Sequence, residues 1–202
     1  MGAIKIKDKN KVFFTSDMHF GHFNIIELVE RKNDEDKLFE SAEEMNEYLI
    51  NAWNEIIPED AIVIDLGDFM FKLPMSDARG IIKRLNFKEI HFVKGNHGRN
   101  YYKEFENIGR KVIVHDKDIV HVIVDDDEFE DNRCEFQVCH YPLVEWDRKF
   151  KGAMHLYGHT HHDHPNEAVG SLHIGIDTNK LRPLAYQEIL TKIYLKIAKK
   201  EL

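Results

Sequence analysis

Short apolar runs separated by helical patterns fill the first half of the chain, and this alternation limits the folds that it can adopt. Each run is unbroken and ends in polar residues, which indicates a buried strand. The runs are 11–16, 61–66 and 89–95. Apolar spacings of three, four and seven over 38–57 indicate an amphipathic helix, and a shorter helix over 76–86 is expected to have Ser76 as its N-cap. This β-α-β-α-β order favours parallel strand pairing and an α/β fold.

The second half of the chain holds short apolar segments with little helical pattern between them, which predicts further strands. These segments are 111–115, 119–124, 135–140, 153–158 and 171–177. An acidic stretch at 125–132 separates two of them, and 187–200 has the pattern of a closing helix whose basic end suits the helix dipole. We expect two sheets packed together with helices outside, in a single domain that covers residues 1–202.

Composition restricts the location and the partners of the protein. No stretch approaches about 18 consecutive apolar residues, and the N-terminus lacks the apolar run of a signal peptide, so we expect a cytoplasmic protein with no membrane partner. Cys134 and Cys139 are five positions apart, suit opposite faces of one strand and predict no disulfide. The net charge of −8 disfavours binding to a long nucleic acid, which needs a basic surface.

Polar residues of the kinds that bind metals occur just after predicted strands, in five separate segments. Strand ends are rigid, and the loops beyond one edge of a sheet converge, which makes that edge the usual ligand site of open α/β sheets. The sequence therefore offers seven candidate ligands: Asp17, His19, Asp68, Asn96, His140, His159 and His161.

The chemistry of this set fits two metal ions, because one ion takes only about four to six donors. Asp68 is the natural bridge, since a carboxylate has two oxygens. His159 and His161 alternate along the chain, so in an extended segment they point the same way about 6–7 Å apart and can serve two ions. The same alternation lets Asp17 and His19 chelate one ion. Nitrogen and oxygen donors without a thiolate suit Mn, Fe, Zn, Co or Ni better than Ca, and Mn is our first candidate.

The motifs that hold these residues resemble the signature of the calcineurin-like metallophosphoesterases, which is D-x-H, G-D, G-N-H, a lone His and G-H-x-H. In this chain the motifs read "DMH", "GDF", "GNH", "CHY" and "GHTH", and they extend from residue 17 to residue 161. The stretches "FTSDMHFGHFNII", "CHYPLVEW" and "GIDTNKLRP" look like a small bacterial and phage branch of that superfamily. The resemblance implies a four-layer α-β-β-α sandwich with two mixed sheets, known as the metallophosphoesterase fold.

The resemblance also implies a role for each residue of the motifs. Two metal ions would be held, the first by Asp17, His19 and His161, the second by Asn96, His140 and His159, with Asp68 as the bridge. His97 would not be a ligand, but would lie beside the substrate phosphate and stabilise the transition state or protonate the leaving group. The family often has an acidic residue after this histidine, whereas Gly98 stands there in this chain, so another partner must orient His97.

Some residues near the motifs have two interpretations each. His22 and Asn24 match the small branch, and they either bind substrate or are structural. Arg99 either meets a substrate phosphate or lies in solvent. Trp146 is either a packing residue of a segment over the site or a stacking surface for a base. Histidines inside predicted strands are expected to be structural: His91, His121, His155 and His173.

The resemblance implies a metal-dependent phosphohydrolase that acts through attack by a metal-bridging hydroxide. The acidic charge of the chain favours a small, nucleotide-like phosphomonoester or phosphodiester as substrate. Two alternatives stay open: a nuclease that acts on DNA or RNA, and a metal-bound binding scaffold with weak or absent catalysis. The sequence does not indicate an oligomeric state.

Overall fold

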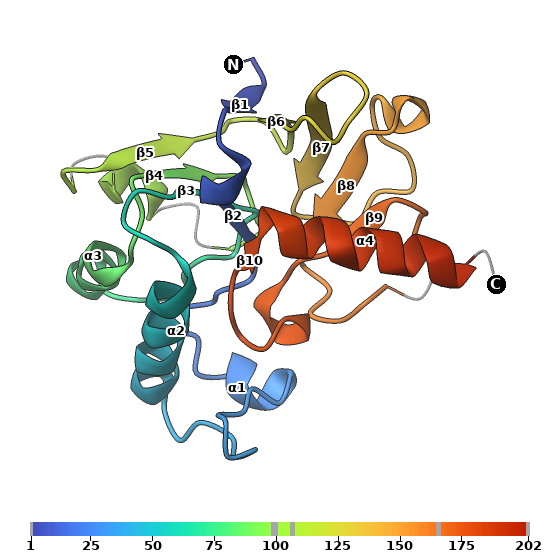
Figure 1. The fold of residues 1–202 in the computed structure, drawn as a ribbon. Helices are drawn as coiled ribbons and strands as arrows, with labels where there is room; N and C mark the ends of the chain where they lie inside the picture. Colours follow the sequence, from blue (N-terminus) through green and yellow to red (C-terminus); the bar gives the residue numbers. More distant parts are fainter. Residues whose placement is uncertain (1, 98–100, 106–107, 165–166, 201–202) are drawn as a thin grey trace.

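The computed structural model describes residues 2–97, 101–105, 108–164 and 167–200, and these residues form two five-stranded sheets flanked by helices (Figure 1). The first sheet has the order β10-β2-β3-β4-β5. Its strands are β2 (Val12–Thr15), β3 (Ile62–Asp65), β4 (Glu89–Phe92), β5 (Lys111–Val114) and β10 (Leu184–Ala185). The strands β2, β3 and β4 pair in parallel, as the sequence predicts, and β5 adds a further parallel strand. The strand β10 pairs antiparallel with β2, so the sheet is mixed.

The second sheet has the order β1-β6-β7-β8-β9. Its strands are β1 (Ile4–Ile6), β6 (Ile119–Asp125), β7 (Arg133–Cys139), β8 (Met154–Tyr157) and β9 (Ser171–His173). The pair β6–β7 is an antiparallel hairpin around the acidic stretch, whereas β1 pairs with β6, β7 with β8 and β8 with β9 in parallel. This sheet is therefore mixed as well.

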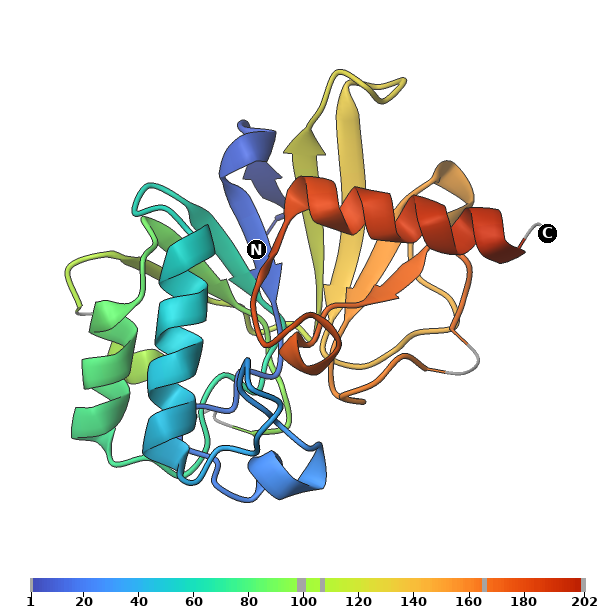
Figure 2. The same cartoon turned by 60° about the horizontal axis from the view of Figure 1, so that its bottom comes forward.

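Three longer helices pack on these sheets (Figures 1 and 2). The helices α2 (Ala42–Ile56) and α3 (Met75–Arg84) lie against the first sheet, and α4 (Tyr186–Lys200) runs across the second. The remaining helical elements are short: α1 (Ile25–Leu28), η1 (Lys9–Lys11), η2 (Tyr102–Phe105), η3 (Lys149–Lys151) and η4 (Ile176–Thr178). This layered arrangement of helices and two mixed sheets is the α/β sandwich that the sequence predicts.

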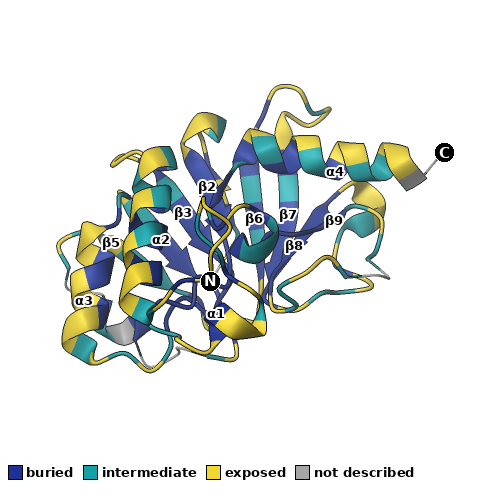
Figure 3. Cartoon of the chain, turned by 90° about the horizontal axis from the view of Figure 1, so that it is seen from below, coloured by how far each residue is buried: buried dark blue, intermediate teal, exposed yellow. Residues whose placement is uncertain are grey.

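The apolar side chains form two buried clusters, and the strands between them are buried on both faces (Figure 3). One cluster joins α2 and α3 to the first sheet and includes Trp53 and Phe92. The other lies between the sheets and reaches α4; within it the rings of Phe14 and Phe136 lie 5.6 Å apart. Burial on both faces explains the unbroken apolar runs of β2, β3 and β4, and it holds rigidly the strand ends from which the polar loops begin.

The structure corrects several expected boundaries. Ser76 is not the N-cap of α3, because the helix begins at Met75 directly after Pro74, whose fixed φ suits the start of a helix. The strand expected over 171–177 ends at His173, since residues 176–178 turn into η4. The elements β1, α1 and β10 are too short to show a period in the sequence, and none of them was predicted.

Cys134 and Cys139 are buried free thiols on β7. Their odd separation places them on opposite faces of that strand. Among the described residues, no helix is both long enough and apolar enough to cross a membrane.

Candidate metal centre

The seven candidate ligands follow the ends of strands from both sheets. Within the first sheet, Asp17 and His19 follow β2, Asp68 follows β3, and Asn96 follows β4. In the second sheet, His140 follows β7, and His159 and His161 follow β8. These strands are parallel neighbours within each sheet, so their carboxyl ends lie at one edge. Backbone hydrogen bonds join the loops, with the N–H of Asp17 donating to Gly67 O at 3.0 Å and that of His19 to Asp68 O at 2.9 Å.

Strained backbone marks this edge of the sheets. Five of the seven candidate ligands have positive φ in the left-handed region: Asp17 (59°), His19 (50°), Asp68 (56°), His159 (70°) and His161 (57°). A residue with a side chain adopts this conformation at a cost of about 1–3 kcal/mol, and such residues cluster at functional sites. The hydrogen bonds between the loops stabilise this conformation.

Two glycines of the motifs are required by close approach. A Cβ atom added to Gly95 would overlap the Asp68 carboxylate, and one added to Gly158 would overlap the Asp17 carboxylate and Ser16. The glycine before "NH" and the glycine before "HTH" therefore let two chain segments come close to the acidic residues. Any larger residue at either position would displace a carboxylate of the candidate centre.

The first group of candidate ligands (Asp17, His19 and His161) has one ligand atom from each residue within 4.8 Å of the others. Asp17 and His19 are buried, and His161 is half-buried. The Nε2 atom of His19 is buried and has no hydrogen-bond partner in the described part of the chain. Burial and the nearby charge of Arg31 lower the pKa of His19 to about 2, so its imidazole is neutral and can act as a ligand.

Asp177 holds the third member of this group, and the sequence analysis did not identify it. Its Oδ2 atom accepts a hydrogen bond from Nδ1 of His161 at 2.6 Å, which leaves Nε2 of that ring with its lone pair. Arg31 is buried and donates to Asp177 at 2.8 Å and to the backbone oxygen of Met18 at 2.8 Å. Burial opposes ionisation of Asp177, but the charge of Arg31 lowers its pKa to about 2. Asp177 lies in "GIDTNKLRP", one of the stretches that resemble the small branch, so a signal for it existed.

The second group of candidate ligands (Asn96, His140 and His159) brings the side-chain oxygen of Asn96 close to two imidazole nitrogens. Nδ1 of His140 donates to Leu66 O at 3.0 Å, so its Nε2 carries the lone pair in the neutral ring. Oδ1 of Asn96 lies 2.8 Å from this Nε2 atom and 3.0 Å from Nδ1 of His159. In the neutral ring the lone pair of His140 Nε2 faces that of Asn96 Oδ1, and such a contact needs a proton or a cation between the two atoms. Burial lowers the pKa of His140, but the hydrogen bond and the charge of Asp68 raise it above its ordinary value. Asp68 therefore favours a proton on the His140 ring.

Asp68 lies between the two groups. Its Oδ2 atom is 3.7 Å from Nε2 of His19, in the first group, and 3.5 Å from Nε2 of His140, in the second. Its Oδ1 atom accepts the backbone N–H of His97 at 2.8 Å. Burial alone would raise the pKa of Asp68, but the hydrogen bond and charge of His140 lower it to about 2, so the carboxylate is ionised.

These observations fit divalent cations. The donors are nitrogen and oxygen atoms, several are buried, and His19 presents a ring nitrogen that no described group satisfies. The ligand atoms of Asp17, Asp68 and His140 also lie within 4.8 Å of one another. Because His140 belongs to the second group, the Asp17 carboxylate is within reach of both groups. Asp17 is thus placed more centrally than the resemblance implies.

The other residues singled out from the sequence lie in different surroundings. Nδ1 of His22 is 3.2 Å from Nδ1 of His19, so His22 contacts a candidate ligand. Asn24 is exposed and precedes α1, with no side-chain hydrogen bond to that helix. Trp146 is 8% exposed, packs 5.2 Å from the ring of His155 and donates to Ala153 O at 2.7 Å, which is a packing position and no stacking surface. Arg99 lies outside the described residues.

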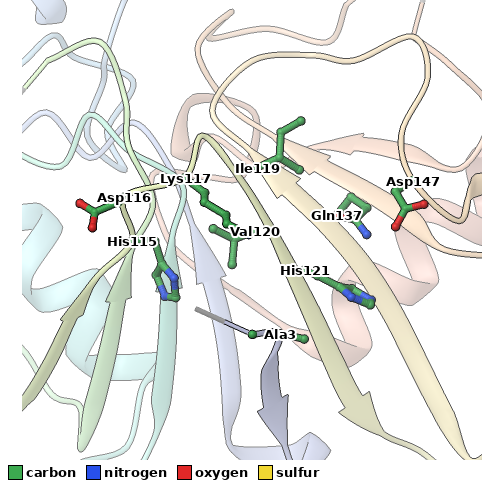
Figure 4. Close-up of a pocket in the computed structure, with 10 residues that line it drawn as sticks. Ala3, His115, Asp116, Lys117, Ile119, Val120, His121, Gln137 and Asp147 are labelled. Atoms are coloured by element: carbon green, nitrogen blue, oxygen red, sulfur yellow. The ribbon is translucent and has the colours of Figure 1, made fainter.

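The cavity in Figure 4 has a volume of about 430 Å³ and is lined by residues of β6, β7 and the loop between β5 and β6. None of the seven candidate ligands lines it. His115 lines this cavity and bonds His91 at 2.9 Å, and His91 bonds Glu89 at 2.8 Å. These contacts give His91 a structural position within β4, in agreement with its place in a predicted strand.

The comparisons with known proteins support the fold. No family model matches the chain. The chain is 28% identical over 190 residues to an uncharacterized protein of Methanocaldococcus jannaschii, and 91% of each chain is covered. Among solved structures, it resembles a protein of unknown function from Aquifex aeolicus, with a TM-score of 0.62, 18% identity and coverage of 89% of this chain and 97% of that one. A weaker likeness to the nuclease MPE of Pseudomonas putida has a TM-score of 0.42, 19% identity and coverage of 75% of this chain and 62% of that one.

Replacing Asp68 by Asn is expected to weaken the binding of both metal ions, because the carboxylate lies between the two groups. Asn tolerates the left-handed backbone at this position, so the change removes mainly the charge.

Asn96→Ala removes a candidate ligand of the second group only and should weaken one of two binding events. Calorimetric titration of Mn²⁺ into metal-free protein measures both variants. Two unchanged binding events in Asp68→Asn would contradict a bridging position.

Asp177→Asn is expected to lower the affinity of the first group by about 10- to 100-fold, the usual effect of losing a carboxylate that orients a metal-binding histidine. The matched control is Asp163→Asn, since Asp163 lies two residues after His161, is largely exposed and bonds only Lys196 among the described residues. Circular dichroism first establishes that both variants fold, and the same Mn²⁺ titration compares them. Equal affinities in the two variants would show that Asp177 does not orient His161.

Proposed function

We propose that this protein is a calcineurin-like metallophosphoesterase that hydrolyses a phosphoester bond with two divalent metal ions, for which Mn is the first candidate. The observation that carries the proposal is the position of Asp68, whose Oδ2 atom lies 3.7 Å from a histidine of the first group and 3.5 Å from a histidine of the second. A carboxylate between two sets of ligands is the arrangement that a pair of ions requires. The resemblance of the five motifs supports the same assignment.

Each residue of the candidate centre would have one of two roles, holding an ion or orienting a residue that does. The two groups and Asp68 would hold the ions, while Asp177 and the carbonyl of Leu66 fix the ring N–H of His161 and of His140. When bound, the ions would supply Lewis acidity, which lowers the pKa of a coordinated water and offsets negative charge on the phosphate.

His97 would serve as the general acid for the leaving oxygen. Its backbone N–H donates to Asp68 at 2.8 Å, so this residue is held next to the proposed bridge without being a member of either group. Its ring is half-buried, and the centroid lies 5.9 Å from that of His19. An imidazole in this position is within reach of a phosphoester bound at the centre and can give a proton to the leaving group.

A small substrate is favoured by the state of the basic side chains near Trp146. The stretch 148–151 is the most basic turn beside that residue, yet Arg148 pairs with Glu135 at 2.5 Å and Lys149 pairs with Glu145 at 3.0 Å. Glu135 lies near the start of β7, whereas the candidate ligand His140 follows the end of that strand. These cations are therefore engaged and distant from the candidate centre, which leaves the recognition of a small phosphoester as the simpler proposal.

His97→Ala is expected to lower turnover by about 10²- to 10⁴-fold, the range for loss of a general acid. The bound metal should stay close to the wild-type amount, because the ring of His97 is not a proposed ligand. Steady-state kinetics and elemental analysis of the same protein samples test both parts. Loss of metal in parallel with loss of activity would make His97 a ligand and contradict its role.

The substrate class is tested by comparing kcat/KM for a linear or cyclic dinucleotide and a phosphomonoester with that for a DNA duplex of about 30 base pairs, each at two salt concentrations with added Mn²⁺. We expect a small substrate to be preferred, with weak dependence on salt, because a chain with a net charge of −8 is poorly suited to bind many phosphates at once. A preference for the duplex that falls steeply with salt would identify a nuclease instead. Wild-type protein that hydrolyses none of these substrates would refute the proposed function.

A further inference from the structure

Four aromatic rings form a closed cluster beside the candidate metal centre. Centroid distances around the cluster are 5.1 Å from His19 to His22, 3.9 Å from His22 to Phe71, 4.9 Å from Phe71 to His97 and 5.9 Å from His97 back to His19. Three of the members are histidines. Phe71 is the member that can neither bind a metal nor transfer a proton, so its place in the cluster calls for a different explanation.

The backbone fixes the position of Phe71. Its N–H donates to Phe20 O at 2.9 Å, and the neighbouring residues Phe20 and Met70 form a parallel bridge. The loop after β3 is thereby joined to the loop after β2, which carries His19. The ring of Phe71 is half-buried and lies against His22 at an interplanar angle of 33°. The backbone of Phe71 is thus held by the loop after β2, and its ring is held by contact with His22.

His97 needs such a contact. Its backbone is held by Asp68, but a backbone hydrogen bond does not fix the rotation of the imidazole. Among the described residues, the ring of His97 forms no hydrogen bond, and its ring contacts are with His19 and with Phe71, the latter edge-to-face at 84°. Edge-to-face aromatic pairs contribute about 0.5–1.5 kcal/mol beyond the area that they bury, enough to favour one ring orientation.

We propose that Phe71 is a positioning residue that holds the imidazole of His97 in the orientation needed to protonate the leaving group. This inference rests on the proposed function, and it names the partner that takes the place of the acidic residue often found after this histidine. The Phe71 ring also lies 6.5 Å from that of His19, a proposed ligand, so the amount of bound metal must be measured to separate the two contacts. The edge-to-face contact with Phe71 would then hold the His97 ring, as a hydrogen bond to an acidic side chain would otherwise do.

The decisive comparison uses Phe71→Leu, which keeps an apolar side chain but removes the ring, and Phe71→Tyr, which keeps the ring. For a phosphoester with an alkoxide leaving group, which needs a proton, kcat should fall by about 10- to 100-fold in Phe71→Leu, the cost of a small misplacement, and stay near wild type in Phe71→Tyr. For a nitrophenyl ester, whose leaving group departs without a proton, the fall should be small. KM and bound metal should be unchanged.

In a His97→Ala background, Phe71→Leu should cause no further loss of kcat.

The control is Phe23→Leu, because Phe23 is 51% exposed, follows His22 directly and makes no ring contact among the described residues. It should leave both kinetic constants unchanged. A readout that does not depend on activity is the NMR resonances of the His97 ring protons in metal-free protein. These should shift in Phe71→Leu, because the ring current of Phe71 is lost, and stay in place in Phe23→Leu.

Three results would overturn the inference: an equal fall in kcat for both leaving groups, an undiminished effect of Phe71→Leu in the His97→Ala background, or unchanged His97 resonances. These outcomes differ from a failure of the proposed function, in which the wild-type protein hydrolyses neither ester. In that case the NMR comparison still decides whether the Phe71 ring contacts His97.

Discussion

The carboxylate of Asp68 is the point at which the loops of both sheets meet. One oxygen accepts the backbone N–H of His97, and the other faces a ring nitrogen from each sheet, His19 and His140. Much of the local structure follows from making room for this group. Gly95 must lack a side chain because a Cβ atom would overlap the carboxylate, and Asp68 itself adopts a strained left-handed backbone. These features are costly for a fold and useful for a site that binds cations.

Besides Asp68, the side chains of two further acidic residues, Asp17 and Asp177, are buried. Burial raises the pKa of Asp17 and opposes its ionisation, and cations at the candidate centre would reverse that effect. Arg31 is buried nearby, and its guanidinium donates to Asp177 and to the backbone oxygens of Asp17 and Met18 in the loop after β2. Asp177 in turn fixes the ring of His161. A buried ion pair of this kind adds little to stability by itself, so its value lies in fixing the geometry of the candidate ligands.

The sequence predicts this architecture where patterns are long and fails where they are short. Unbroken apolar runs identify β2, β3 and β4, and the polar residues beyond them identify the edge at which the candidate ligands gather. The two-residue strand β10 has no period to detect, and Pro74 overrides Ser76 at the start of α3. Asp177 and Phe71 are missed for another reason: their roles depend on contacts with residues distant along the chain. The motif that holds Asp177 resembles the small branch, but it does not indicate the contact with His161.

Anomalous X-ray diffraction from crystals grown with saturating Mn²⁺ tests the proposal that two metal ions bind on either side of Asp68. This proposal predicts two anomalous peaks, one beside Asp17, His19 and His161 and the other beside Asn96, His140 and His159, with the Asp68 carboxylate between them. A single peak at these residues, or manganese bound only elsewhere on the protein, would contradict it.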